Sequence, residues 1–262
     1  MTTEHMLPSQ SECDAFFSKI EVPAKARYAK IEVPSDLPIN STEEGAVMGR
    51  KSPIILAFAD GFSPDKRQAA MNTTQFAETY ADSQASRKKN ALAWYEAYRE
   101  GMRNCGWFTT SYVFSDHHTG DTNITMDSVV LDVVKMVAGV NSAGVLDLLG
   151  RVFDTVKKDQ TIVKMFNNNS KDETVASCQI MPCMESEAGH GVSIFAGFEC
   201  EYSADKGGAW FWEWKVSSLK IKKVATVVNF DFQHYQRNEA SILERVYSSS
   251  ETFFKNLAKS KL

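Results

Sequence analysis

MDSVVLDVVKMVAGVNSAGVLDLLGRVFDTVKK, residues 126 to 158, has the most distinct apolar pattern in the chain. Apolar side chains recur in it every three or four positions, which is the period of a helix with one buried face. A turn at residues 139 to 142 divides this apolar stripe in two. Its members are Val129, Val130, Val133, Val134, Val137 and Val140 before the turn, and Val145, Leu146, Leu149, Val152, Phe153 and Val156 after it. The pattern predicts a pair of amphipathic helices.

The polar residues of this helix pair fall on the side opposite the stripe. Asp147 and Arg151 are four positions apart, in the order that favours an ion pair, and Thr125 and Ser142 stand where N-caps are expected. A helix pair of this kind can pack on a sheet or leave it for a lipid interface. The stretch therefore predicts an interaction activity.

After Asn169 the apolar pattern changes from the helical period to the two-residue period of strands. Strands are expected over residues 54 to 58, 107 to 115, 173 to 181, 191 to 202, 208 to 216 and 219 to 232, and helices over residues 64 to 80, 86 to 102 and 236 to 259. Short connections between the late strands favour an antiparallel meander. The predicted fold class is α+β, a single domain in which an antiparallel sheet, mainly from the C-terminal half, is covered by amphipathic helices.

The first fifty residues contain a repeated segment, Lys19 to Pro23 and then Lys30 to Pro34, that reads KIEVP both times. Each Val-Pro step favours extended backbone. Residues 1 to 50 are therefore predicted to form an extended, proline-containing arm, either lying across the domain or serving as a plain linker, and the ordered domain, residues 51 to 262, is expected to begin near Ser52.

The composition excludes several classes of protein. A net charge of −4, from 33 acidic and 29 basic residues mixed along the chain, argues against nucleic acid as a partner. Five cysteines without a CxxC pair argue against structural zinc and a disulfide framework, and favour a reducing compartment. The N-terminus has no basic and apolar regions of a secretory signal peptide, so cytoplasmic synthesis is expected, with any release by another route. The apolar stretch around the helix pair is interrupted by charges, so any contact with a lipid membrane is expected to be conditional.

Chemistry-bearing residues are sparse. One polar loop, Asp116, His117, His118 and Asp121, holds metal-capable side chains, but their spacing matches no motif with a known mechanism, so a plain polar loop is the preferred interpretation. The basic triplet at residues 87 to 89 is expected on a solvated face. Because no nucleophile, phosphate-binding or dinucleotide motif is present, the sequence predicts neither an enzyme nor a cofactor.

An aromatic run has two interpretations. Trp210, Trp212 and Trp214 alternate, so a strand would place them on one face, either in the core or as a belt at a membrane interface. The lysines that follow are Lys215, Lys220, Lys222 and Lys223. These lysines suit either contact with anionic lipid or protection of an edge strand.

The order of these elements resembles that of the Cyt-type cytolytic toxins and the Cyt-like virulence factors. The resemblance extends over residues 52 to 262 and includes the passage from Phe198-Glu199-Cys200-Glu201-Tyr202 through Trp210-Phe211-Trp212 to Leu219-Lys220-Ile221-Lys222-Lys223-Val224, which is similar to that family's late strands. In that family helix hairpins cover a sheet and can move away from it at a membrane. The resemblance implies this behaviour for residues 126 to 158.

The leading functional expectation is a soluble, membrane-active protein, of a pore-forming or cytolytic kind, whose helix pair releases from the sheet. Contact with membrane or partner is expected from Val129, Val133, Val137, Leu146, Leu149 and Phe153, together with the tryptophans and lysines named above. The alternative is a non-enzymatic interaction or self-assembly protein that uses the N-terminal arm and the aromatic strand face.

Overall fold

The computed structural model describes residues 6–21, 43–109, 112–117, 125–139, 142–172, 175–201, 220–246 and 254–256. In chain order the elements are α1 (Gln10–Ser18), β1 (Gly45–Gly49), β2 (Ile54–Phe58), α2 (Pro64–Gln84), α3 (Ala91–Asn104), β3 (Trp107–Phe108), β4 (Ser115–His117), α4 (Met126–Ala138), α5 (Ser142–Lys158), α6 (Gln160–Ser170), β5 (Lys171–Asp172), β6 (Val175–Glu185), β7 (Gly191–Glu201), β8 (Lys220–Phe230), α7 (Phe232–Val246) and β9 (Phe254–Asn256). This order of elements confirms the α+β class.

One sheet runs through the domain in the order β3-β8-β7-β6-β2-β1-β9, with β4 added to β8 and β5 added to β6. Its centre is an antiparallel trio, β6, β7 and β8, each 11 residues long. The register of β7 and β8 runs from Gly191 opposite Phe230 to Glu201 opposite Lys220. The C-terminal half therefore supplies most of the antiparallel sheet, as expected, although β2 joins β6 in parallel.

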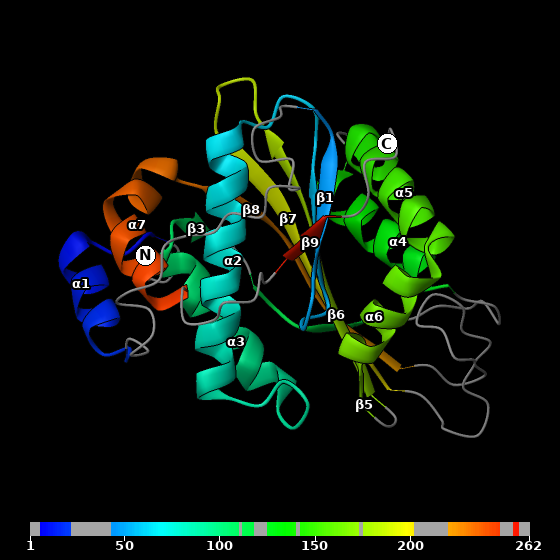
Figure 1. Ribbon diagram of the computed structural model, residues 1–262, viewed down its shortest axis with the longest axis horizontal. Helices are drawn as coiled ribbons and strands as arrows, with labels where there is room; N and C mark the ends of the chain where they lie inside the picture. The colour runs from blue at the N-terminus through cyan, green and yellow to red at the C-terminus, as the bar shows by residue number, and fades with distance from the viewer. Residues whose placement is uncertain are drawn as a thin grey trace.

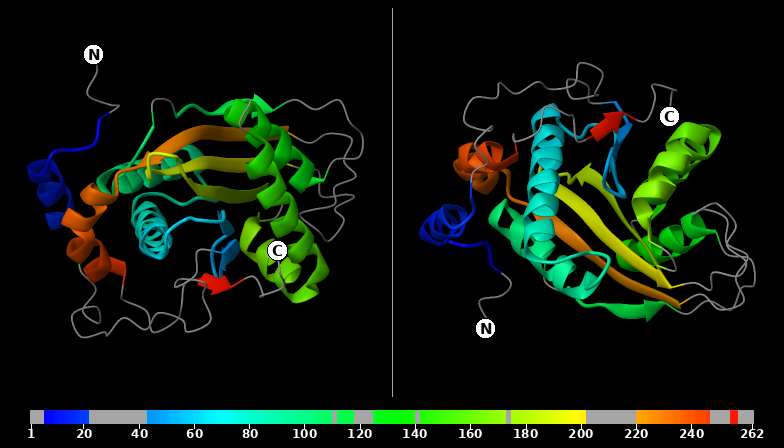
Figure 2. Two further views of the ribbon diagram at one scale, coloured as in Figure 1. Left: turned by 90° about the horizontal axis from the view of Figure 1, so that it is seen from above. Right: turned by 60° about the horizontal axis from the view of Figure 1, so that its bottom comes forward.

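Helices cover both faces of this sheet (Figures 1 and 2). The layer of α2, α3 and α7, with α1 outside α7, packs on one face, and the layer of α4, α5 and α6 packs on the other. The apolar residues of the strands accordingly divide into two cores, one beneath each layer. A sheet covered on both faces must be apolar on both, which explains the near-continuous burial of β6 and β7.

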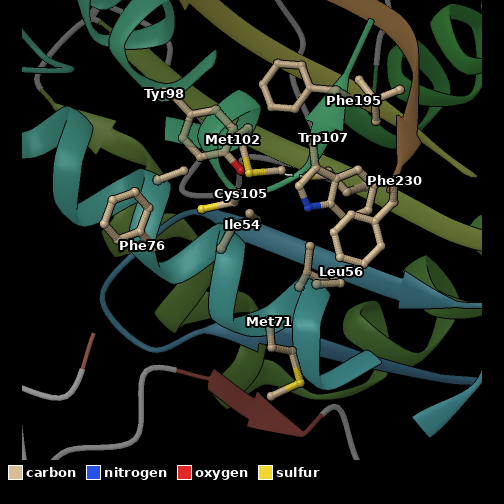
Figure 3. Close-up of a cluster of buried hydrophobic side chains, with 14 of the residues drawn as sticks. Ile54, Leu56, Met71, Phe76, Tyr98, Met102, Cys105, Trp107, Phe195 and Phe230 are labelled. Carbon is tan, nitrogen blue, oxygen red and sulfur yellow. Dashed lines mark hydrogen bonds between the residues drawn. The ribbon is translucent and has the colours of Figure 1, made fainter. Parts of the chain in front are cut away.

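Aromatic rings fill the core beneath α2 and α3 (Figure 3). Trp107 stacks on Phe230, with ring centroids 4.4 Å apart, and its Nε1 donates a hydrogen bond of 2.9 Å to Thr73 Oγ1. Tyr98 stacks on Phe195 at 5.4 Å. These pairs attach α2 and α3 to the far strands of the sheet.

The N-terminal region contains more regular structure than its sequence predicted. Ser9 and Glu12 form a capping box that begins α1, and β1 starts at Gly45, so the expectation that order begins near Ser52 is wrong. The rings of Phe16 and Phe17 pack edge-on and tilted against Phe76 of α2, and this aromatic contact explains why α1 is attached. Most of the KIEVP repeat falls in residues 22–42, which the structure does not describe.

Three other expectations about elements are corrected. β7 pairs directly with β8, so no strand from residues 208 to 216 lies between them; those residues are themselves outside the described ranges. Of the expected helix over residues 236 to 259, the structure describes α7 as far as Val246; residues 247–253 lie outside the described ranges, and Phe254–Asn256 is a strand and not a continuation of the helix. Helix α6 was missed: Asp159 Oδ1 caps it by accepting from the backbone N–H of Thr161 at 2.9 Å.

Arg87 is mostly buried, with its side chain 11% exposed, contrary to the solvated face predicted for residues 87 to 89, whereas Lys88 and Lys89 are exposed as predicted. Arg87 Nη2 lies 3.4 Å from Glu78 Oε1, and the guanidinium carbon lies 3.7 Å from the centre of the Trp94 ring. Ser52 also donates a hydrogen bond to Glu78. Burial raises the pKa of Glu78, while the charge of Arg87 opposes that rise. The α2–α3 connection is therefore fixed to the core by a charged pair that local sequence does not reveal.

Gly197 permits the closest contact between α3 and the sheet. A Cβ atom at this position would lie 2.9 Å from Tyr95 Cε1 and 3.1 Å from Val224 Cγ1. The Tyr95 hydroxyl in turn donates to the carbonyl of Cys178, at 3.3 Å. The Tyr95 ring therefore crosses β7 at Gly197, the position that has no side chain.

We predict that Gly197→Ala lowers the free energy of unfolding by about 1 to 3 kcal/mol, because the added methyl overpacks the Tyr95 ring. Urea denaturation measures the change. The control is Gly150→Ala in α5, where nothing lies within 4 Å of the new Cβ and the loss of a helix glycine should stabilise by up to about 1 kcal/mol. Equal stability of the two variants would contradict the close approach.

Candidate functional site

The helix pair predicted from the sequence is α4 and α5, and their contact with the sheet is apolar. Every buried residue of the two helices is a methionine, valine, leucine or phenylalanine: Met126, Val129, Val130, Val133, Val134, Val145, Leu148, Leu149, Val152, Phe153 and Val156. They form the larger part of the core beneath this layer, together with residues of α6 and of strands β1, β2, β6, β7 and β8. We call α4 and α5 together the hairpin.

The structure brings the six predicted hairpin residues to this interface, to different depths. Val129, Val133, Leu149 and Phe153 are at most 2% exposed. Val137 and Leu146 are partly buried at its margin. Leu148, which the predicted stripe omitted in favour of Leu146, is buried instead, because the face of α5 is rotated by a fraction of a turn from the prediction. The sequence therefore identified the buried face, with a small error in its centre.

Three ion pairs involve the hairpin. Arg151 of α5 binds both Asp147, as the sequence spacing predicted, and Glu44, which immediately precedes β1. The hydrogen bonds that Arg151 donates to Glu44 and then to Asp147 raise the pKa of Arg151. Lys157 pairs with Asp127 and so joins the end of α5 to the start of α4. The contacts to Glu44 and Asp127 link residues far apart in the chain, and nothing in the local sequence indicates them.

The lysines of β8 lie among acidic residues. Lys222 Nζ lies 3.8 Å from Glu199 Oε1, and Lys220 stands opposite Glu201 in the register of β7 and β8. Asp116 of β4 faces Lys222 from the other side. Burial raises the pKa of Glu199, and Lys222 partly offsets this. Lys223 stands opposite Ser115. This part of the sheet is therefore an alternation of charges, in which acidic groups compensate much of the basic charge.

Several predicted site residues cannot be placed. Trp210, Trp212, Trp214 and Lys215 belong to residues 202–219, outside the described ranges, so both interpretations of the aromatic run stay predictions. His118 and Asp121 are likewise not described. Their neighbours Asp116 and His117 lie in β4. Within the described residues, no three His, Cys, Asp or Glu side chains group as metal ligands.

A buried Cys–His contact was not predicted, because its members are 221 positions apart. Cys13 Sγ of α1 lies 3.4 Å from His234 Nε2 of α7, and the same nitrogen lies 3.1 Å from the carbonyl oxygen of Asn104. Burial raises the pKa of the Cys13 thiol and lowers the pKa of His234, so both groups are held neutral. The contact therefore fastens α1 to α7 and lacks the thiolate that nucleophilic catalysis uses.

The remaining cysteines are core residues. All five cysteines are free and buried. Burial raises the pKa of Cys183 and of Cys200 to about 12 each. Cys178 and Cys183 in β6 and Cys200 in β7 are completely buried and fill space in the core.

Comparison with known proteins finds structures similar in fold. One, described as "Structure of the Evf virulence factor", matches 90% of this chain and 90% of its own at 12% identity, with a TM-score of 0.39. Another, described as a delta-endotoxin, matches 80% of this chain and 89% of its own at 11% identity, with a TM-score of 0.40. The chain matches no family model and no curated protein.

Both structures are described as proteins of the kinds that the sequence resembles. The similarity is in the overall arrangement of helices and strands. At these TM-scores it carries no conclusion about activity. Across the described part of the chain, no helix has the length and apolar content to cross a membrane. Any function at a membrane must therefore be argued from the geometry of the hairpin.

The burial of His234 predicts a pH dependence of stability. Its pKa is lowered by burial in the folded protein, whereas in the unfolded chain it titrates near its ordinary value of about 6.5. The unfolded state therefore binds more protons, and stability that is present above about pH 6.5 is lost as the pH falls toward the lowered value. Asp231 opposes this effect and Arg237 adds to it.

We expect the stability of His234→Gln to vary less with pH over this window than that of the unchanged protein, as measured by denaturant midpoints from pH 7.5 to 5. His190→Gln, which changes an exposed histidine, is the control and should retain the full dependence. Identical pH profiles for the His234 variant and the parent would contradict the assignment.

Proposed function

We propose that this is a membrane-active, non-enzymatic protein, of the cytolytic or host-directed toxin kind, in which the hairpin leaves the sheet and turns its apolar face to lipid. The observation that supports the proposal is the composition of the interface: all buried residues of α4 and α5 are apolar. Such a face can be buried equally well by the sheet or by acyl chains.

The hairpin is stabilised by the burial of apolar surface both when it packs on the sheet and when it lies in lipid. Release exposes apolar surface on the hairpin and on the sheet, at a cost of about 25 cal/mol per Å2, and insertion recovers a similar contribution for the hairpin. The outward face of the helices is mostly polar and includes Asp132, Lys135, Asp147 and Arg151, with Met136 exposed beside them. A helix with one apolar and one charged face lies in the plane of the membrane interface instead of crossing the bilayer.

The lengths of the helices support the same mode. Helix α5 has 17 residues and α4 has 13, which at about 1.5 Å per residue is shorter than the roughly 30 Å of a hydrocarbon core. We therefore infer that the hairpin inserts as a shallow wedge that disturbs lipid packing. Its partner is a lipid surface, and no catalytic group takes part.

The decisive experiment measures release of a trapped dye from vesicles while α4 is tied to the sheet. Met126, the first residue of α4, places its Sδ 3.9 Å from Cys200 Sγ of β7. Met126→Cys therefore sets a new thiol beside Cys200. We expect the oxidised variant, with its crosslink verified by mass spectrometry, to lose dye release and to recover it on reduction.

The matched control is Met126→Cys combined with Cys200→Ser, which cannot form this crosslink and should release dye under both conditions. Full activity of the verified crosslinked protein would show that another element acts on the membrane. If the unchanged protein neither binds nor permeabilises neutral or anionic vesicles between about pH 5 and 8, the proposed function itself is wrong.

A further inference from the structure

Residues 43 and 44, just before β1, receive polar contacts from the layer of α2. The Arg67 side chain of α2 is completely buried and donates hydrogen bonds to the carbonyl oxygens of Glu43 and Phe62, the latter at 2.8 Å. Asp60 Oδ1, in the loop after β2, accepts from the backbone N–H of Glu44 at 2.9 Å. The backbone that carries the Glu44 carboxylate is therefore held in place from this side of the sheet.

Arg151 approaches the same carboxylate from the opposite layer. Its Nε donates to Glu44 Oε2 at 3.0 Å and its Nη2 donates to Oε1, so the guanidinium binds the carboxylate with two parallel hydrogen bonds. Its third nitrogen, Nη1, binds Asp147 on its own helix, which fixes the side chain in the required direction. The Arg151 and Glu44 side chains are 33% and 19% exposed. Two-point geometry and partial burial make this pair stronger than an ordinary surface ion pair.

The two layers lie on opposite faces of the sheet (Figure 1). Contacts that run from Arg67 through residues 43 and 44 to Arg151 join the two layers. They lie where the first residue of β1 stands beside the last residue of β2. We propose that these contacts form a latch, defined by Arg67, Glu43, Glu44, Asp60 and Arg151, which holds α5 on the sheet and sets how readily the hairpin opens. Its consequence at a membrane rests on the proposed function, but its effect on opening does not.

The position of the latch suits this role. The buried interface of the hairpin is apolar and therefore has no directional contact of its own, whereas the two-point pair at Arg151 is directional. The anchored partner, Glu44, remains with the sheet when α5 moves. Opening must therefore break the Arg151–Glu44 pair, and the pair opposes the first step of release.

The chain contains its own reporters of this opening. Cys178 and Cys200 lie in the core beneath the hairpin, whereas Cys13, Cys105 and Cys183 lie in the core beneath the other layer. Burial raises the pKa of all five thiols, so each reacts slowly with a thiol reagent until its layer opens. Labelling resolved by mass spectrometry therefore distinguishes opening of the hairpin from unfolding of the whole domain.

We expect Arg151→Met to accelerate labelling of Cys178 and Cys200 by about three- to tenfold in the absence of lipid, the factor appropriate to a partly buried two-point ion pair. Glu44→Gln should do the same, and the double variant should label no faster than either single variant, because both remove one interaction. The matched control is Lys158→Met, which removes the same charge from an exposed position on the same helix and should change labelling less than twofold.

Unchanged labelling in Arg151→Met, equal acceleration in Lys158→Met, or equal acceleration of all five cysteines would overturn the latch. Dye release by Arg151→Met provides the separate readout for the proposed function. Faster labelling of Cys178 and Cys200 without any dye release would leave the latch standing and reject the membrane activity. Dye release that requires the hairpin, together with unchanged labelling in Arg151→Met, would support the membrane activity and reject the latch.

Discussion

The antiparallel pairing of β6, β7 and β8 is the constraint on which the rest of this structure depends. The three strands are equally long and are paired over most of their length; β6 and β7 are buried on both faces, whereas β8 alternates between buried and more exposed positions. A sheet in this position needs an apolar cover on each side, since unpaired apolar surface in water is unfavourable. The two helical layers are the covers. The hairpin is part of one of these covers, and it is the element that we propose exchanges the sheet for lipid.

The two layers differ in how they are attached. Beneath α2 and α3 lie aromatic pairs, a tyrosine that crosses β7 at Gly197, and the mostly buried pair of Arg87 and Glu78. Such contacts have preferred directions and are disturbed by small displacements. Beneath α4 and α5 lie mostly aliphatic side chains, which pack without strong orientation. This difference in packing makes the hairpin layer the one better suited to separate from the sheet as a unit.

The proposed function depends on this difference in packing between the two layers, and no catalytic group takes part in it. Neutral buried thiols, a neutral Cys–His contact and charges that alternate along β8 give the described residues little reactive chemistry. What the structure offers is an amphipathic element, a directional contact that holds it, and a sheet whose strand pairing does not include it. These are the properties needed for a protein that changes its partner from its own sheet to a lipid surface.

The sequence by itself determined the elements whose signal is local. The valine stripe of α4, the apolar face of α5, the helix start at Ser63-Pro64 and the two-residue period after Asn169 are written in neighbouring positions, and each was found in the expected place. Local signals failed where tertiary contacts override them. Helix α6 continues through an asparagine run because it packs on the core, and Arg87 packs against Glu78 and Trp94 instead of pointing into solvent.

Three long-range pairings became known only from the tertiary structure. Strand β2 lies parallel to β6, β7 lies directly beside β8, and Arg151 binds Glu44, which is 107 positions away in the chain. Pairings over such distances depend on how the whole chain folds, and the residues next to one partner in the sequence do not indicate which residue the other partner is.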